Sequence, residues 1–119
     1  MAIPSRVQAS GNSGLATTSI CGDGATALVA VGSTIADALQ LSAVWNAVTT
    51  SSASTGLILP PTEVGAMVGV RNDSGSTIII YPKAGSTINA GAANLSVATA
   101  KTVILFATSA TTWASVLTA

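Results

Sequence analysis

The residues that could do chemistry in this 119-residue chain are few and lie far apart in the sequence. Histidine is absent and Cys21 is the single cysteine, so a cysteine nucleophile would lack its usual base and a zinc site its usual ligands. The four carboxylates stand singly, without the alternating acidic loop that holds calcium; they are Asp23, Asp37, Glu63 and Asp73. We therefore expect a protein that is not an enzyme and has no catalytic residues, no metal site and no cofactor.

A glycine-rich stretch at residues 22–27, GDGATA, fits a relaxed form of the dinucleotide-binding pattern. That pattern requires a helix to begin there within a βαβ unit, with an acidic residue about 20 positions further on. The segment that follows, ALVAVGSTI, is strand-like and is stopped by Gly32. We predict a turn at residues 22–27 and no nucleotide site.

The two tryptophans, Trp45 and Trp113, could stack on sugars, which is the usual aromatic contact of a carbohydrate-binding module. Only 3% of the residues are aromatic, however, so large side chains are scarce for filling a core. We expect both tryptophans in the core, with the sugar-stacking role as the alternative.

Charged side chains make up 7% of the chain, and the formal net charge is zero. A folded chain of this mass exposes roughly 5,800 Å² of surface, which leaves one charge for about every 700 Å². Free soluble domains carry many more charges, so we expect the surface to be covered by a partner or by copies of the same chain. The cations are dispersed, which argues against a nucleic-acid partner and against an electrostatic contact with a membrane.

Targeting signals are not evident in the sequence. No apolar run reaches the length of a membrane-spanning helix, and the first ten residues lack the apolar core of a signal peptide. We therefore expect synthesis and retention in the cytoplasm, with exit only inside a larger particle. The lone Cys21 fits a reducing compartment, where we expect it as a small buried hydrophobe.

Short apolar and β-branched runs alternate with Gly, Asn, Asp, Ser and Pro clusters from residue 15 onward, which is typical of an all-β sandwich or barrel. The predicted strands are residues 15–21, 25–31, 38–41, 44–50, 56–59, 66–71, 77–81, 95–98, 102–108 and 112–117. We expect an all-β fold, an antiparallel and jelly-roll-like β-sandwich, over residues 15–119. Residues 1–14 are polar and interrupted by Pro and Gly, which predicts an extended N-terminal arm.

One segment, residues 33–48, is ambiguous between helix and strand. Ser33 or Thr34 could cap a helix there, with Asp37 in its first turn. The Thr and Val residues of the segment favour strands, which we predict, with the helix as the alternative.

The sequence RNDSGST between two predicted strands carries residues that close tight turns. It predicts a hairpin between residues 66–71 and residues 77–81. In the second strand Ile78 and Ile80 face one way, and the alternate positions face the other. Both faces are largely apolar, so we expect the second face to contact another subunit. Its candidate contact residues are Thr77, Ile79 and Tyr81.

The tetrapeptide Gly-Ser-Thr-Ile occurs at residues 32–35, 75–78 and 85–88. The copies are 43 and then 10 residues apart, so they have no constant repeat period. In each copy glycine can leave a turn, the hydroxyls can satisfy nearby backbone groups, and isoleucine can begin burial. We predict that each copy marks the start of a strand.

A series of turns and strands covers slightly more than half of the chain, from residue 56 onward. It comprises a turn at Leu59-Pro60, a Gly-led strand at residues 65–71, a turn at Asn72, a strand ending in Tyr81-Pro82, a Gly-x-x-Ile-Asn turn at residues 85–89 and a late strand with Trp113. This series resembles small β-rich virion proteins of tailed bacteriophages, in particular head decoration (cement) proteins. The turn before the Phe-bearing strand, ATAKT, departs from the family pattern, which often has glycine there.

The resemblance implies a non-enzymatic, oligomeric β-sandwich, commonly a homotrimer, that binds the capsid exterior and stabilises the head by bridging major capsid protein subunits. If so, the N-terminal arm should lie on a capsid subunit or on an adjacent copy. Its candidate contact residues are Ile3, Pro4, Arg6 and Val7. The same series is similar to parts of tail and fibre proteins, so a receptor- or glycan-binding module is the alternative function, and an unrecognised hydrolase comes third.

Overall fold

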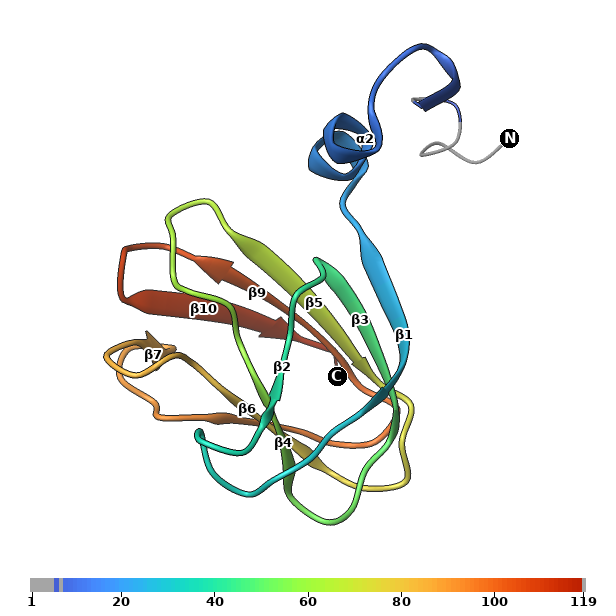
Figure 1. Ribbon diagram of the computed structural model, residues 1–119. Coiled ribbons are helices and arrows are strands. Elements are labelled where there is room, and N and C mark those ends of the chain that lie inside the picture. Colours follow the sequence, from blue (N-terminus) through green and yellow to red (C-terminus); the bar gives the residue numbers. More distant parts are fainter. Residues whose placement is uncertain (1–5, 7, 119) are drawn as a thin grey trace.

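The computed structural model describes residues 6 and 8–118, which form ten strands and the helix α2 (Figure 1). In chain order the elements are α2 (Gly14–Cys21), β1 (Gly24–Val29), β2 (Leu39–Gln40), β3 (Trp45–Thr50), β4 (Thr55–Ile58), β5 (Met67–Asn72), β6 (Ile78–Tyr81), β7 (Thr87–Ile88), β8 (Leu95–Val97), β9 (Thr102–Ala107) and β10 (Thr112–Leu117). The all-β class is therefore confirmed.

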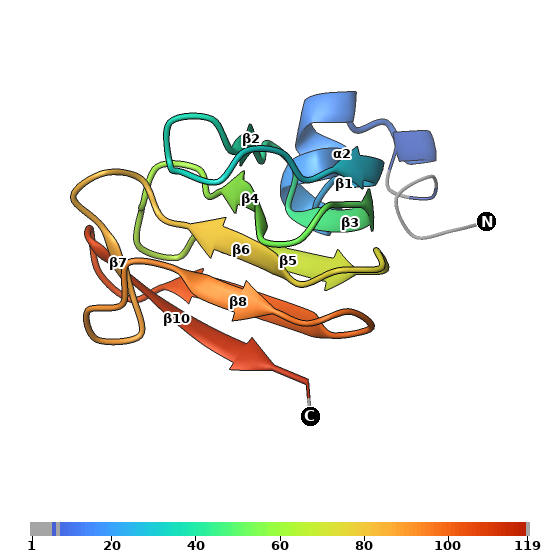
Figure 2. The same cartoon turned by 90° about the horizontal axis from the view of Figure 1, so that it is seen from below.

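The strands form two sheets, one of six strands in the order β1-β3-β5-β9-β10-β7 and one of four in the order β2-β4-β6-β8. Figure 1 shows β5, β9 and β10 in one layer and β4 and β6 in the other, and Figure 2 brings β6 and β8 to the front. From β1 to β6 the chain alternates between the sheets, and each new strand lies parallel to the previous one in its own sheet. This winding is solenoid-like, and the antiparallel strands β8, β9 and β10 complete the two sheets.

The expected antiparallel, jelly-roll-like pairing is wrong for most of the fold, since five of the eight strand pairs are parallel. The predicted hairpin between residues 66–71 and residues 77–81 does not form, because β5 and β6 belong to different sheets. The turn between them carries the chain across the core. The buried Asn72 holds it there by donating from Nδ2 to the carbonyl oxygens of Ser76 and Val97, each at 2.9 Å.

The N-terminal region also differs from the prediction. Residues 15–21 are part of helix α2 rather than a strand, because Ser13 caps the helix: its Oγ accepts from the Ala16 N–H at 3.1 Å. Before α2, the Ser10 N–H donates to the Arg6 carbonyl at 3.1 Å, so this stretch is turned rather than extended. In Figure 1 α2 lies apart from the two sheets, so the projecting segment reaches Cys21 and not only residue 14.

The remaining predicted strands all correspond to strands of the structure, and β7 was not predicted. Within residues 33–48 the strand interpretation is correct, since a turn, β2 and β3 occupy the segment. Two of the three Gly-Ser-Thr-Ile copies precede β6 and β7 as expected. The first copy is an exception, because it forms a turn and leaves Ile35 39% exposed.

The core lies between the two sheets and is built almost entirely from aliphatic side chains. Its fully buried members include Val48, Leu57, Leu59, Val70, Ile78, Ile80, Ile88, Val97, Val103, Leu105 and Trp113. Trp113 is in the core as expected, and its indole Nε1 donates to Thr62 Oγ1 at 3.0 Å. The corresponding prediction for Trp45 is wrong, because that side chain is 41% exposed.

Candidate functional site

The outer side of the six-stranded sheet carries an unusual set of exposed apolar side chains. Alternate residues of β3, β5, β9 and β10 point away from the core, and the outward apolar positions include Trp45, Met67, Ile104, Phe106, Ala114 and Val116. We call these six residues the apolar face. Four of them are prominently exposed, with exposed fractions of 41% for Trp45, 44% for Met67, 40% for Phe106 and 60% for Val116.

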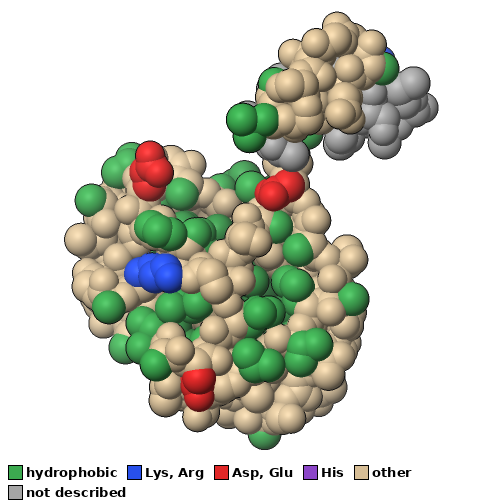
Figure 3. Space-filling view, in the orientation of Figure 1, with side chains coloured by type: hydrophobic (Ala, Val, Ile, Leu, Met, Phe, Trp, Pro, Cys, Tyr) green, Lys and Arg blue, Asp and Glu red, His purple; other side chains and the backbone are tan. Residues whose placement is uncertain are grey.

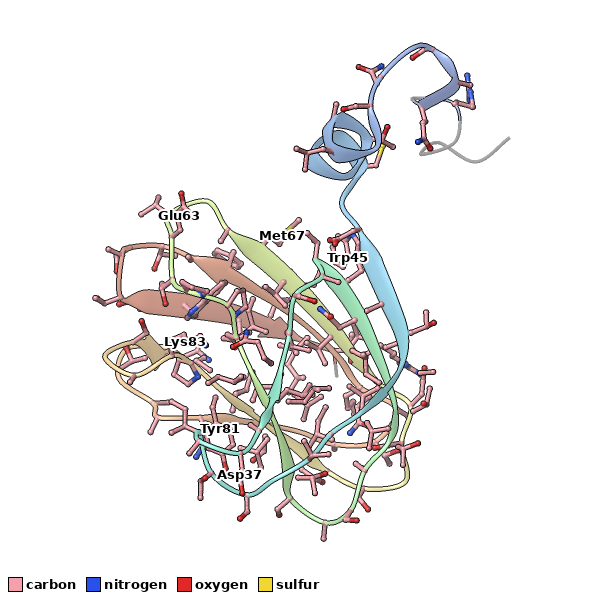
Figure 4. The ribbon with its side chains drawn as sticks, viewed as in Figure 1. Asp37, Trp45, Glu63, Met67, Tyr81 and Lys83 are labelled. Carbon is pink, nitrogen blue, oxygen red and sulfur yellow. The ribbon has the colours of Figure 1, made fainter. Side chains whose placement is uncertain are left out.

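Strand register brings these residues together in two rows. In one row Trp45 pairs with Gly69, Gly69 with Ile104, and Ile104 with Val116. In the next row Phe106 lies between Met67 and Ala114. Figure 4 shows Trp45 and Met67 near one another at the end of the sheet closest to α2. The apolar face is therefore continuous across four strands.

Trp45 lies over the backbone of Gly69. A Cβ atom at residue 69 would be 2.2 Å from Cε3 and 2.4 Å from Cζ3 of Trp45, so only glycine leaves room for the ring in this position. Beside the ring is an open hollow of about 230 Å³, bordered by Arg71 and Thr102. Sequence reasoning missed this arrangement, although a glycine between Val68 and Val70 in a strand is a signal of close approach by another group.

Arg71, which borders the apolar face on β5, is neutralised within the chain. Arg71 Nε donates to Asp73 Oδ1 at 2.7 Å, and Arg71 Nη1 donates to the Ala100 carbonyl at 2.9 Å. Both side chains of the pair are close to half exposed, so the pair itself contributes little to stability. Its consequence is that the border of the apolar face carries no net charge here.

The predicted subunit-contact residues lie on the opposite side of the molecule, on the four-stranded sheet. Thr77 is exposed, whereas Ile79 and Tyr81 are half-buried, and all three face away from the buried Ile78 and Ile80 as predicted. The Tyr81 hydroxyl already makes a hydrogen bond within the chain, since it donates to the Ser33 carbonyl at 2.9 Å. The role of these residues in a subunit contact stays a prediction.

The predicted arm contacts are only partly described. Arg6 is exposed, while Ile3, Pro4 and Val7 lie outside the described residues. Cys21 at the end of α2 is a free thiol that is half-buried rather than fully buried. The structure therefore leaves the contact role of the arm as a prediction.

A second hollow, of about 390 Å³, lies where the four-stranded sheet meets the loop before β7. We call it the Lys83 hollow, and its polar and aromatic lining residues are Thr34, Tyr81, Lys83, Ser86 and Asn94. Two copies of the Gly-Ser-Thr-Ile tetrapeptide, the first and the third, thus contribute to one surface depression. This meeting was not predictable from sequence, because the two copies are 53 residues apart in the chain.

The first tetrapeptide copy is held in its turn by Asp37. Asp37 Oδ1 accepts from the backbone N–H groups of Ser33 at 3.1 Å and Thr34 at 2.8 Å, and from Thr34 Oγ1 at 2.8 Å. The Thr34 hydrogen bonds, backbone first and then hydroxyl, hold the pKa of Asp37 below its ordinary value. The carboxylate is therefore a structural cap of this turn.

The acidic side chains and the cysteine of the described residues do not gather into a metal centre. No group of three His, Cys, Asp or Glu side chains comes close enough there to hold a metal ion. The dinucleotide-like stretch at residues 22–27 does not open a helix, as predicted, but the predicted turn is wrong for residues 24–27, which begin strand β1. Asp23 Oδ1 accepts from the Val44 N–H at 2.8 Å. Among the described helices, none is long and apolar enough to cross a membrane. Comparison of the chain with family models, curated proteins and solved structures found no match.

Proposed function

We propose that this chain is a structural assembly protein, a decoration protein that binds the outside of a tailed-phage head and stabilises it. The observation that carries the assembly role is the apolar face, an exposed and continuous patch on a chain with very little charge. The virion location, the major capsid protein as partner and the trimeric state rest on the sequence resemblance alone. In this proposal the protein is not an enzyme.

The size of the apolar face supports a protein partner. If each large side chain offers about 200 Å², the exposed fractions of Trp45, Met67, Phe106 and Val116 correspond to about 370 Å² of exposed apolar surface. Patches of about 300–600 Å² are the largest on typical monomers and are often functional. An interface buries about 800 Å² on each partner, so the apolar face has the size expected of the core of an interface surrounded by a polar rim.

The partner that we propose for the apolar face is another copy of the chain. The six side chains of the apolar face are uncharged and the adjacent Arg71 is paired with Asp73, so these residues bring no unpaired charge into a contact between two such faces. Three copies around a common axis can bury their apolar faces together, which accommodates the trimer that the resemblance implies. The assembled copies then present their remaining surfaces to the capsid.

The location of the chain on purified virus particles tests the virion part of the proposal. We expect mass spectrometry to detect the chain in particles, and immunogold labelling to place it on the outside of the head. Absence from purified particles would overturn the proposal. Labelling of the tail or its fibres would favour the alternative, a receptor- or glycan-binding module, which the unexpected exposure of Trp45 also supports.

A further inference from the structure

We propose that the Lys83 hollow binds an acidic sugar, meaning a saccharide unit that bears a carboxylate. This inference does not rest on the proposed function, because it concerns a different surface and can be tested with the isolated chain. The hollow lies on the edge of the four-stranded sheet, whereas the apolar face covers the outside of the six-stranded sheet. Three features of the hollow carry the argument: an uncompensated cation, a directed hydroxyl donor and a mixed aromatic and amide wall.

The cation is Lys83, whose charge has no acidic partner. Its Nζ donates to Gln40 Oε1, which uses one of three donors. Among the described residues the single ion pair is that of Arg71 and Asp73, so no carboxylate lies within 4.0 Å of Lys83. Figure 4 shows the Lys83 side chain apart from the labelled Glu63 and Asp37, and on the side of the molecule seen in Figure 3 the blue cationic surface is separate from the red acidic patches. The Lys83 ammonium is exposed and has two donors left, so it can receive an anion.

The directed hydroxyl belongs to Ser86. A relay of hydrogen bonds begins at the buried Trp113, whose Nε1 donates to Thr62 Oγ1 at 3.0 Å. The Thr62 hydroxyl then donates its own proton to Ser86 Oγ at 2.7 Å. Ser86 therefore accepts in this relay, and no described residue accepts its hydroxyl proton in return. Ser86 thus contributes a hydroxyl donor to the lining of the hollow, which Lys83 also lines.

The remaining walls favour a sugar over a simple ion. Tyr81 and Ile35 provide apolar surface for the C–H groups of a pyranose ring, while Asn94 offers an amide that can both donate and accept. A volume of about 390 Å³ is within the usual range of small-molecule sites and far exceeds that of a bare anion. A carboxylate at Lys83 and Ser86, with ring hydroxyls toward Asn94, uses all of these groups at once.

Nuclear magnetic resonance titration of the isotopically labelled chain with D-glucuronate tests the proposal. We expect saturable shifts at Lys83, Ser86 and Asn94, with D-glucose binding at least about tenfold more weakly, because it lacks the charge that Lys83 receives. Lys83→Met, which keeps the length of the side chain but removes its charge, should weaken glucuronate binding by a similar factor. Lys101→Met, outside the hollow, is the matched control and should leave binding unchanged.

The second variant is Ser86→Ala, which should weaken binding severalfold while the dispersion of the amide spectrum shows that the fold is kept. Equal binding of glucose and glucuronate, or full retention of binding by Lys83→Met, would overturn the charge argument. Inorganic phosphate that binds as tightly as glucuronate and shifts the same residues would show a simple anion site and would overturn the sugar assignment. Absence of shifts in the hollow at about 10 mM glucuronate, a concentration above the dissociation constants of weak specific complexes, would overturn the proposal altogether.

Discussion

Adding one methyl group at Gly69 should displace Trp45 from the sheet and destabilise the protein. The new Cβ in Gly69→Ala would lie 2.2 Å from Cε3 of Trp45, which is far inside contact distance. Because Trp45 is at the surface, we expect its ring to swing away rather than the sheet to distort. The free energy of unfolding then falls by the energy of the apolar contact that the ring loses. The size of this loss follows from the buried area of the Trp45 side chain.

Trp45 is 41% exposed, so about three fifths of its side chain is buried. Three fifths of roughly 225 Å² is about 135 Å², which at about 25 cal/mol for each Å² corresponds to about 3 kcal/mol. Part of this contact survives in the new position, so we expect a loss of about 1–3 kcal/mol, which is also the usual cost of adding a methylene to a packed site.

Urea denaturation at a fixed protein concentration measures this loss, and tryptophan emission reports the ring. We expect Gly69→Ala to shift the emission toward that of a solvated indole. In a Trp45→Ala background the same methyl should cost little, so the two changes are not additive. Gly75→Ala is the matched control, because its Cβ meets nothing within 4 Å, and it should change stability by less than about 0.5 kcal/mol. A Gly69→Ala protein as stable as the wild type, with unchanged emission, would refute the reasoning.

Three further changes test other parts of the structure. Asn72→Ala should lower the free energy of unfolding by about 3 kcal/mol in urea denaturation, because removal of the buried amide leaves several backbone groups unpaired. A smaller loss than that of Thr77→Ala, an exposed control, would contradict the role of Asn72 in holding the turn. Asp37→Asn should destabilise the chain at pH 7. The difference in free energy of unfolding from the wild type should shrink as pH falls below about 4, because a carboxyl group with a lowered pKa stabilises the fold only while it is ionised. A difference that stays constant down to pH 2 would exclude this cap. Ile79→Lys should dissociate the assembly or make the protein insoluble if the four-stranded sheet also contacts a subunit, and a soluble, still-oligomeric variant by sedimentation would exclude this face.

The strands could be predicted from the sequence because strand position depends on local patterns of apolar residues and turn formers. Their pairing could not, because the residues after β5 are equally compatible with a hairpin and with a crossing between sheets. The crossing between sheets is held by the hydrogen bond from Asn72 to the carbonyl of Val97, which is 25 residues away in the chain. Helix α2 was missed because the β-branched residues of the segment favour a strand, and the cap that Ser13 provides is seen only in the structure.

The candidate surfaces were harder to predict than the fold. In β3 both faces look apolar in sequence, so only the pairing of Trp45 with Gly69 shows that the ring points outward. The Lys83 hollow depends on Thr34 and Ser86, which lie on separate loops brought together by the winding of the chain. The charge scarcity, in contrast, was evident from composition alone, and it led to the expectation of a covered surface before any face was known.

Sedimentation velocity of the wild-type chain and of Phe106→Lys tests the central claim, that the apolar face joins copies of the chain. Phe106 lies between Met67 and Ala114, so a lysine there would place an unpaired charge within the contact. We expect the wild type to be an oligomer at micromolar concentration and Phe106→Lys to be a folded monomer by circular dichroism. Ala53→Lys, on an exposed turn, should sediment like the wild type. A wild-type chain that remains a monomer at about 100 μM, well above the dissociation constants of stable assemblies, would contradict the claim.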